Sequence, residues 1–186
     1  MQTPELFEAI LADLSRTLRQ VDPAQLAHLQ TAILRADRIF IAGKGRTGLQ
    51  MKAFAMRLMH LGLTVYVVDD VTTPSIAAAD LLLVGSSSGH SASLLRHVAT
   101  AQAIGASIST VTGNLESPIA AAATTRVHIP ASNFKAGANR GEDSVLVMGS
   151  LFEHCLGLLC DLLIIRLKHA LQVDESAMNA RHANLE

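Results

Sequence analysis

An apolar run at residues 80–84 stops abruptly at a cluster of serines and glycines, and this junction constrains the fold most. The run is followed by Gly85-Ser86-Ser87-Ser88-Gly89-His90, and an amphipathic run begins at Ser91. This order predicts a buried parallel strand, a tight hydroxyl-rich turn and a helix start. The N–H groups and positive dipole end of a helix N-terminus suit a phosphate. A plain strand-to-helix turn with Ser91 as N-cap has the same residue preferences, so this stretch alone leaves both interpretations open.

A second junction of the same kind lies near residue 43. A short apolar run at 38–42 is followed by Gly43-Lys44-Gly45-Arg46-Thr47-Gly48, and residues 49–61 are predicted to be helical. The turn lacks the Gly-Lys-Ser/Thr ending of a Walker loop. Its three glycines also match a dinucleotide-binding fingerprint, with Asp69 as the acid expected about 20 residues further on. A nucleotide-binding oxidoreductase is therefore one alternative function.

Apolar and β-branched runs alternate with helical patterns through the middle of the chain. Strands are expected at 39–42, 64–68, 81–84, 107–112 and 126–129, with intervening helices that include 49–61 and 91–104. This alternation predicts an α/β fold with a doubly wound, five-stranded parallel sheet in the flavodoxin-like order 2-1-3-4-5. In that order strands one and three are neighbours. The two turns would therefore line one crevice at the carboxyl ends of these strands.

The length of 186 residues predicts a single domain over 1–186. Helices expected at 3–20 and 25–35 form an N-terminal arm over 1–36, or else cover one face of the sheet. The α/β core is assigned to 37–144, and 145–186 holds a long helix at 145–171 followed by a polar tail. The long helix is apolar on almost every face, which predicts burial in a subunit interface. A loop expected at 130–144 carries Lys135 and Arg140 as candidate lid residues.

Composition excludes several classes of function. The net charge is −1, no long basic run occurs and aromatic residues make up only 3%, which argues against binding nucleic acid or an anionic membrane. No apolar stretch is long enough to span a bilayer, and no secretion signal is recognised at the N-terminus. Cys155 and Cys160 lie in one apolar stretch, at a helical spacing that does not favour a disulfide, so reduced thiols and a cytoplasmic location are expected.

Several stretches together carry a resemblance to a known family. They are Gly43–Gly48 with Lys52–Leu58, Thr72–Pro74, Ser86–Ser91, Met148–Glu153 and Ala180–Glu186. In these the chain resembles the sugar isomerase (SIS) domain and, within it, the 6-phospho-3-hexuloisomerases. The serine turn is typical of SIS domains in general. The Gly-Ser-Leu-Phe-Glu stretch that ends at Glu153 and the terminal Arg-His-Ala-Asn-Leu-Glu are more specific to the hexuloisomerases.

The resemblance implies a function and a set of site residues. It implies interconversion of D-arabino-hex-3-ulose 6-phosphate and D-fructose 6-phosphate, in the ribulose monophosphate pathway of formaldehyde fixation, by a homotetramer without metal or cofactor. Glu153 corresponds to the base of the family, and His182 on the tail to a group that reaches an active site in its own or a neighbouring subunit. The phosphosugar-binding residues carried over are Gly45, Arg46, Thr47, Ser86, Ser87, Ser88, Gly89, His90 and Ser91.

The chemistry of this isomerisation fits the residue types. Moving a carbonyl from C3 to C2 through a cis-enediolate requires one base on one face of the substrate. Glu153 is an acid in an otherwise apolar helix, which suits a base, although a salt bridge would also explain it. His182 or His90 is a candidate donor to the enediolate oxygen. Arg46 is a candidate partner for phosphate or a sugar hydroxyl, or else a solvated turn residue.

Two turns depart from the usual pattern of the family. The first usually reads Gly-Ala-Gly-Arg-Ser-Gly, whereas this chain has Lys44 and Thr47 at the second and fifth positions. Thr47 keeps the hydroxyl group, and Lys44 is expected to add positive charge near the anion. The serine turn usually ends Gly-Glu-Thr, and here His90 stands in place of the carboxylate. An isomerase of another ketose phosphate and a non-catalytic phosphosugar sensor are therefore kept as alternatives. A sensor of this kind usually carries a DNA-binding domain, and no basic helix pair is visible here.

Overall fold

The computed structural model describes residues 2–131 and 144–185, and a five-stranded parallel sheet lies at its centre. The predicted α/β class and the strand order β2-β1-β3-β4-β5 are both confirmed. The lid candidates Lys135 and Arg140 lie outside the described residues. The strands are β1 (Ile39–Gly43), β2 (Val65–Val67), β3 (Leu81–Ser86), β4 (Ser107–Thr112) and β5 (Thr125–His128).

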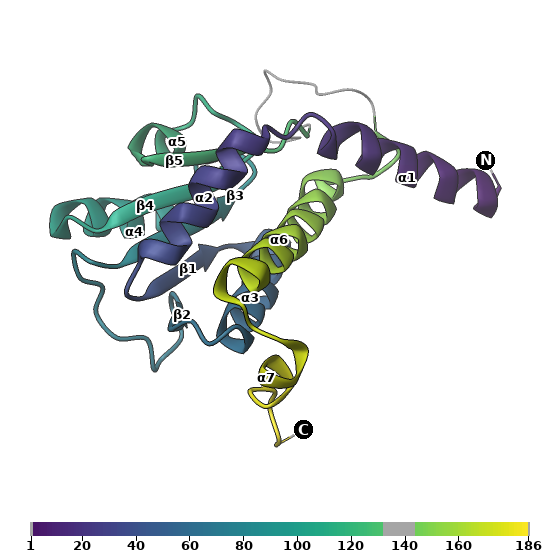
Figure 1. The fold of residues 1–186 in the computed structure, drawn as a ribbon. Helices are drawn as coiled ribbons and strands as arrows, with labels where there is room; N and C mark the ends of the chain where they lie inside the picture. Colours follow the sequence, from purple (N-terminus) through teal and green to yellow (C-terminus); the bar gives the residue numbers. More distant parts are fainter. Residues whose placement is uncertain (1, 132–143, 186) are drawn as a thin grey trace.

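Helices cover both faces of the sheet, and one helix projects away from it (Figure 1). Helices α2, α3 and α6 pack on one face, and α4 and α5 pack on the other. Helix α1 leaves the sheet and contacts the start of α6, so only α2 of the first two helices covers a sheet face. The helices are α1 (Thr3–Leu18), α2 (Pro23–Arg35), α3 (Gly45–His60), α4 (Ala92–Ile104), α5 (Pro118–Ala122), α6 (Ser150–Leu171) and α7 (Glu175–Asn179).

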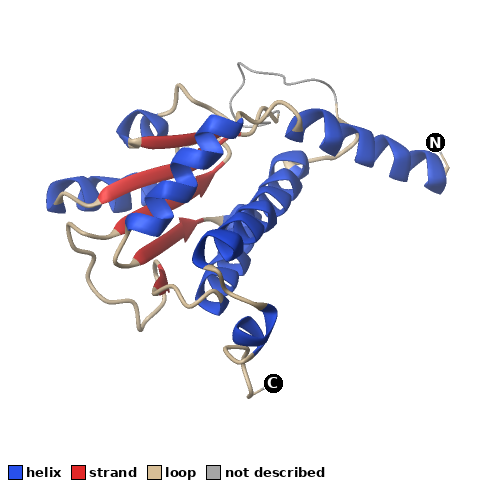
Figure 2. Ribbon diagram, in the orientation of Figure 1, coloured by secondary structure: helices blue, strands red, loops and turns tan. Residues whose placement is uncertain are grey.

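The two central strands are buried on both faces because helices cover both sides. In β1, Ile39 and Ile41 belong to the core under α2, α3 and α6, whereas Phe40 and Ala42 belong to the core under α4 and α5. Successive side chains of a strand point to opposite faces, so a strand buried on both faces needs a continuous apolar run. Figure 2 shows the resulting layers of helix, sheet and helix. Within the described ranges no helix has the length and hydropathy of a membrane span.

The register between β1 and β3 positions the two turns. Gly43 of β1 pairs with Gly85 of β3, so both strands reach their carboxyl ends at the same level of the sheet. Immediately beyond that level the chain turns into α3 on one side and toward α4 on the other. The shared crevice expected from the strand order therefore follows from this pairing.

Several predicted element boundaries were wrong. Helix α3 begins at Gly45 rather than at residue 49, so most of the first glycine turn is the first turn of the helix. Helix α6 begins at Ser150 rather than at residue 145. The reason lies in Met148 and Gly149, whose φ values of 59° and 82° are left-handed and cannot continue a right-handed helix.

Smaller corrections concern the ends of other elements. Strand β3 runs two residues further than predicted, through Gly85 and Ser86, and β5 is shifted by one residue to Thr125–His128. The polar tail contains the short helix α7, because the Asp174 side chain accepts a hydrogen bond from the backbone N–H of Ala177 and caps it. Both cysteines are free and buried, as expected.

A buried ion pair holds the amino ends of β1 and β3 together. Asp80 is 2% exposed, and Arg38 donates to both of its carboxylate oxygens, at 3.0 Å and 2.7 Å. The backbone N–H of Ala77 adds a third bond at 2.6 Å. Burial alone would raise the pKa of Asp80, but the hydrogen bonds from Arg38 and Ala77 outweigh burial and hold it below its ordinary value of 3.8.

We predict that Asp80→Asn lowers the free energy of unfolding by about 2–3 kcal/mol at pH 7, because it leaves Arg38 without its charged partner. A carboxylate with a lowered folded-state pKa stabilises the protein above its unfolded pKa, and this contribution is lost as the pH falls through the folded value. The difference between wild type and variant should therefore shrink below about pH 4. Urea unfolding from pH 3 to pH 8 measures this, with Asp70→Asn as an exposed control. A difference that stays constant with pH would contradict the assignment.

Candidate functional site

The two turns and the start of α6 enclose one cavity. Its volume is about 310 Å³, and it lies at the carboxyl ends of β1 and β3. Its walls combine hydroxyl groups, backbone at two helix starts, two cations and one carboxylate. The cavity-lining residues are Lys44, Gly45, Arg46, Thr47, Gly85, Ser86, Ser87, Ser88, Ser91, Leu94, Met148, Gly149 and Glu153.

The serine turn is held in shape by its own hydroxyl groups. Ser86 Oγ accepts a hydrogen bond from the backbone N–H of Gly89 at 3.1 Å. Gly89 has a φ of 66°, and a Cβ there would lie 2.0 Å from Ser117 Oγ, so only glycine fits this position. Ser87 Oγ is buried and has no hydrogen-bond partner within residues 2–131 and 144–185. A buried hydroxyl without a partner on a cavity wall is available to a ligand.

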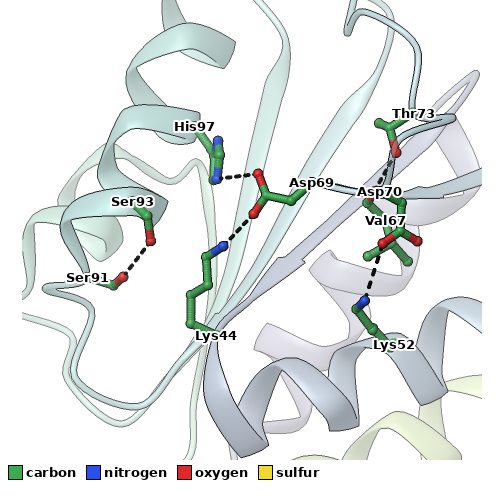
Figure 3. Close-up of polar contacts among 9 residues, drawn as sticks. All are labelled: Lys44, Lys52, Val67, Asp69, Asp70, Thr73, Ser91, Ser93 and His97. Carbon is green, nitrogen blue, oxygen red and sulfur yellow. Dashed lines mark hydrogen bonds and ion pairs between the residues drawn. The ribbon is translucent and has the colours of Figure 1, made fainter.

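The start of α4 also remains available to a ligand. Ser91 occupies the N-cap position, as predicted, but its side chain makes no capping bond. Instead Ser91 Oγ lies 3.1 Å from Ser93 Oγ (Figure 3). A helix whose first turn is not capped by a side chain presents N–H donors and the positive end of its dipole. This end of the cavity can therefore bind an anion such as phosphate.

Close packing explains the glycines of the first turn. A Cβ at Gly48 would lie 2.7 Å from the backbone oxygen of Gly43, and a Cβ at Gly85 would lie 2.5 Å from Met51 Cγ. These glycines let α3 approach β1 and β3 closely, which by itself accounts for the fingerprint-like spacing. Thr47 lies in the first turn of α3, nearly buried, and lines the cavity.

Arg46 and Glu153 form an ion pair across the cavity mouth. Arg46 Nη1 lies 3.1 Å from Glu153 Oε2 and donates to Ser150 Oγ at 2.7 Å. Arg46 Nη2 lies 3.3 Å from His154 Nε2. The Glu153 side chain is 14% exposed and that of Arg46 is 48% exposed. The salt bridge that the sequence left as an alternative for Glu153 is therefore present, on a carboxylate that also lines the cavity.

The two candidate histidines do not line this cavity within one chain. The His90 ring is exposed and its Nδ1 lies 2.7 Å from the backbone oxygen of Ser88. The His182 ring stacks on His60, with ring centroids 5.3 Å apart, at the end of α3. A helix of 16 residues is about 24 Å long, and the cavity lies at the other end of it. His182 therefore lies far from the cavity of its own chain, and its role as a catalytic group stays a prediction.

The structure places on the cavity wall the lysine that the sequence expected near the anion. Lys44 lines the cavity, and its Nζ donates to the Asp69 carboxylate, which also lies 3.5 Å from His97 Nε2 (Figure 3). The hydrogen bond from Lys44 is the main cause that lowers the pKa of Asp69 below its usual range. The acid that would bind ribose in a dinucleotide site is thus already engaged by a lysine. Met148 and Gly149 line the cavity too, and they were missed because the sequence placed them inside a helix.

The fold and this hydroxyl-lined cavity define a class of α/β domains that bind small ligands at the carboxyl ends of parallel strands. A family model described as SIS domain matches residues 32–154. The chain therefore belongs to the SIS domain family.

Relatives place it further within that family. A protein of Mycobacterium gastri named 3-hexulose-6-phosphate isomerase is 41% identical over 94% of this chain and 86% of its own length. A Bacillus subtilis protein of the same name is 37% identical over the full length of both. A solved structure from Methanococcus jannaschii, whose inferred function is 3-hexulose-6-phosphate isomerase, matches with a TM-score of 0.84 and 31% identity over 98% of this chain and 99% of that one. These matches confirm the family that the resemblance indicated, and with it an enzyme of the isomerase class.

Metal ligation was not expected from the sequence. Among the described residues, no group of three or more His, Cys, Asp or Glu side chains is arranged to hold a metal ion. Activity without metal or cofactor stays a prediction.

We predict that Gly89→Ala destabilises the protein and weakens binding of inorganic phosphate at least tenfold, since the new Cβ would displace Ser117 and distort the serine turn. Gly105→Ala is the matched control, because Gly105 is also left-handed, with a φ of 83°, but lies outside the cavity, and its Cβ would have space. That control should lose about 1–2 kcal/mol of stability from its left-handed backbone and keep its phosphate affinity. Urea unfolding and calorimetric titration measure both effects. Equal behaviour of the two variants would contradict the role assigned to the turn.

Proposed function

We propose that this protein is a 6-phospho-3-hexuloisomerase, which interconverts D-arabino-hex-3-ulose 6-phosphate and D-fructose 6-phosphate. The observation that carries the proposal is that Glu153 lines the same cavity as the serine turn. One wall offers donors for a phosphate, and another offers a carboxylate for carbon chemistry. The names of relatives that match over most of their length support the same substrate.

The serine turn and the first turn of α4 are proposed to hold the phosphate. Ser86, Ser87, Ser88 and Ser91 all line the cavity and supply hydroxyl groups. The left-handed backbone at Gly89 leads from these serines to the start of α4, whose N-cap side chain makes no capping bond. A phosphate bound there leaves the sugar carbons to extend toward Thr47, Arg46 and Glu153 on the other walls.

The proposed reaction proceeds through a cis-enediolate. The Glu153 carboxylate removes the proton from C2 of the 3-ulose, and the C3 carbonyl oxygen takes up the resulting negative charge. The same carboxyl group then returns a proton to C3, and the hydroxyl proton moves from O2 to O3, which leaves the carbonyl at C2. One base on one face serves both transfers. Arg46, already bonded to Glu153, positions the base and can donate to an enediolate oxygen.

A homotetramer is part of the proposal, with His182 of a neighbouring subunit as the second catalytic group. Apolar side chains are exposed on two helices that have few neighbours on that side, which is typical of surfaces buried between subunits. They are Leu6, Phe7 and Leu11 on α1 and Leu158, Leu162 and Ile165 on α6. His90, exposed on the turn, is a further candidate for contact with substrate.

The proposed biological setting follows from the substrate. A 3-hexulose 6-phosphate isomerase would act in the ribulose monophosphate pathway of formaldehyde fixation. Two free, buried cysteines suit the cytoplasm as its location. A non-catalytic phosphosugar sensor or an isomerase of another ketose phosphate would use the same phosphate site, and turnover assays separate these functions.

We predict that Glu153→Gln lowers kcat by about 10²–10⁴-fold and leaves binding of fructose 6-phosphate within a few-fold, since only the proton transfer is lost. A coupled assay that detects fructose 6-phosphate formed from 3-hexulose 6-phosphate measures the rate. Asp161→Asn on the same helix is the control, because its carboxylate is exposed and does not line the cavity. Wild-type activity in Glu153→Gln would remove the proposed base. Absence of turnover and of solvent-deuterium incorporation in the wild type would favour the sensor.

We predict that hetero-oligomers of His182→Asn and Glu153→Gln subunits regain activity that neither variant has alone. The physical reason is that a site shared between subunits can receive its intact base from one chain and its intact histidine from the other. Co-expression with two different tags and tandem purification isolates the mixed species for the coupled assay. Mixed species as inactive as the two parents would contradict a shared site.

A further inference from the structure

One cation of the cavity has no role in the proposed function. Lys44 lies at the N-cap position of α3 and lines the cavity. Its Nζ is bonded to the carboxylate of Asp69, which follows β2 in the chain (Figure 3). The Lys44 side chain is 45% exposed, so much of it stays accessible beside the cavity that it lines.

Asp69 occupies a position where its backbone is strained. Its φ of 77° lies in the left-handed region, which glycine adopts at lower cost than aspartate. The backbone therefore does not explain an acid here. The side chain does, because one carboxylate oxygen meets Lys44 and the other lies 3.5 Å from His97 Nε2 on α4. Asp69 thus joins the start of α3 to the helix whose N-terminus faces the cavity.

Of the two cations that line the cavity, Lys44 is the one that is not paired with the proposed base. Arg46 is committed to Ser150, Glu153 and His154. A lysine ammonium has three N–H donors, and the bond to Asp69 uses one of them. A sugar phosphate brings a charge of about −1.5 to −2 at pH 7. An ammonium group anchored at the rim can therefore donate to that anion while it stays bonded to Asp69.

We propose that Lys44 is a phosphosugar-binding residue of this chain and that Asp69 is the positioning residue that holds its ammonium group at the cavity. The assignment rests on the proposed function only in taking a sugar phosphate as the ligand. It goes beyond the pattern of the family, because the usual turn has alanine at the position that Lys44 occupies here.

The state of Asp69 supports a permanent anchor. The hydrogen bond from Lys44 is the main cause that keeps its pKa below the usual range, and the contact with His97 acts in the same direction. The carboxylate is therefore ionised throughout the neutral range, with Lys44 and His97 as the charged or titratable groups that face it. The positioning of Lys44 should accordingly not vary between pH 6 and pH 8.

The chain contains a matched control for this pair. Lys52, further along α3, forms an ion pair with Asp70 at 3.3 Å, and Figure 3 shows the two pairs near each other. Both pairs join α3 to the segment after β2, and both are about half exposed. Neither Lys52 nor Asp70 lines the cavity. Their substitution changes charge and surface packing equally without touching the proposed ligand.

The test is an equilibrium titration of fructose 6-phosphate and, separately, of inorganic phosphate into Lys44→Met, Asp69→Asn, the double variant and Lys52→Met. We expect Lys44→Met to weaken binding of both ligands about tenfold, as loss of one charge-assisted hydrogen bond does. Asp69→Asn should weaken binding of both ligands less than Lys44→Met does. The double variant should bind like Lys44→Met, because Asp69 acts only through Lys44. Lys52→Met should stay within about twofold of wild type. Thermal unfolding of each variant checks that the fold is kept.

Four results would overturn the proposal. They are wild-type affinity in Lys44→Met, tighter binding in Asp69→Asn, additive losses in the double variant, and a wild type that binds neither fructose 6-phosphate nor inorganic phosphate. Because the titration needs no turnover, its outcome is separate from that of the proposed reaction. An inactive wild type whose phosphate affinity still depends on Lys44 would refute the isomerase and retain this assignment. If the wild type is active and Lys44→Met binds both ligands as tightly as the wild type, the isomerase is retained and this assignment is refuted.

Discussion

The parallel pairing of β1 with β3 is the constraint on which the rest of the structure depends. Gly43 and Gly85 are partners in that pairing, so two separate turns begin side by side at one edge of the sheet. The pairing is itself possible only because both strands are buried between helix layers and carry apolar side chains on both faces. Close approach of α3 then requires glycine at 43, 48 and 85. The cavity is thus a product of core packing.

Within the cavity, charge is arranged in pairs. Arg46 faces Glu153, and Lys44 faces Asp69, so each cation at the mouth has a carboxylate partner. Hydroxyl groups and the uncapped start of α4 form the remaining polar wall. Such an arrangement keeps cations in place in the free protein and lets their remaining donors meet an anionic ligand. It also holds the carboxylate of Glu153, the proposed base, in place beside Arg46 on the cavity wall.

Much of the fold could be predicted from the sequence, whereas parts of the site could not. Continuous apolar runs such as 81–84 are typical of buried parallel strands, and Gly105 marks the end of α4 because it is left-handed there. The start of α6 was misplaced, since nothing in Met148 signals a left-handed backbone. Lys44 and Asp69 are 25 residues apart, and their contact depends on how β2 ends beside α3. His182 stacks on His60, a residue far away in the sequence, and periodicity does not encode such a contact.

In the proposed complex the phosphate lies in the serine turn while the sugar carbons face Glu153. A crystal structure of the protein with fructose 6-phosphate tests this most directly. We predict phosphate oxygens within hydrogen-bond distance of Ser86, Ser88 or Ser91, and C2 or C3 of the sugar in contact with the Glu153 carboxylate. A phosphate bound elsewhere, or a Glu153 side chain turned away from both carbons in every subunit, would contradict the account.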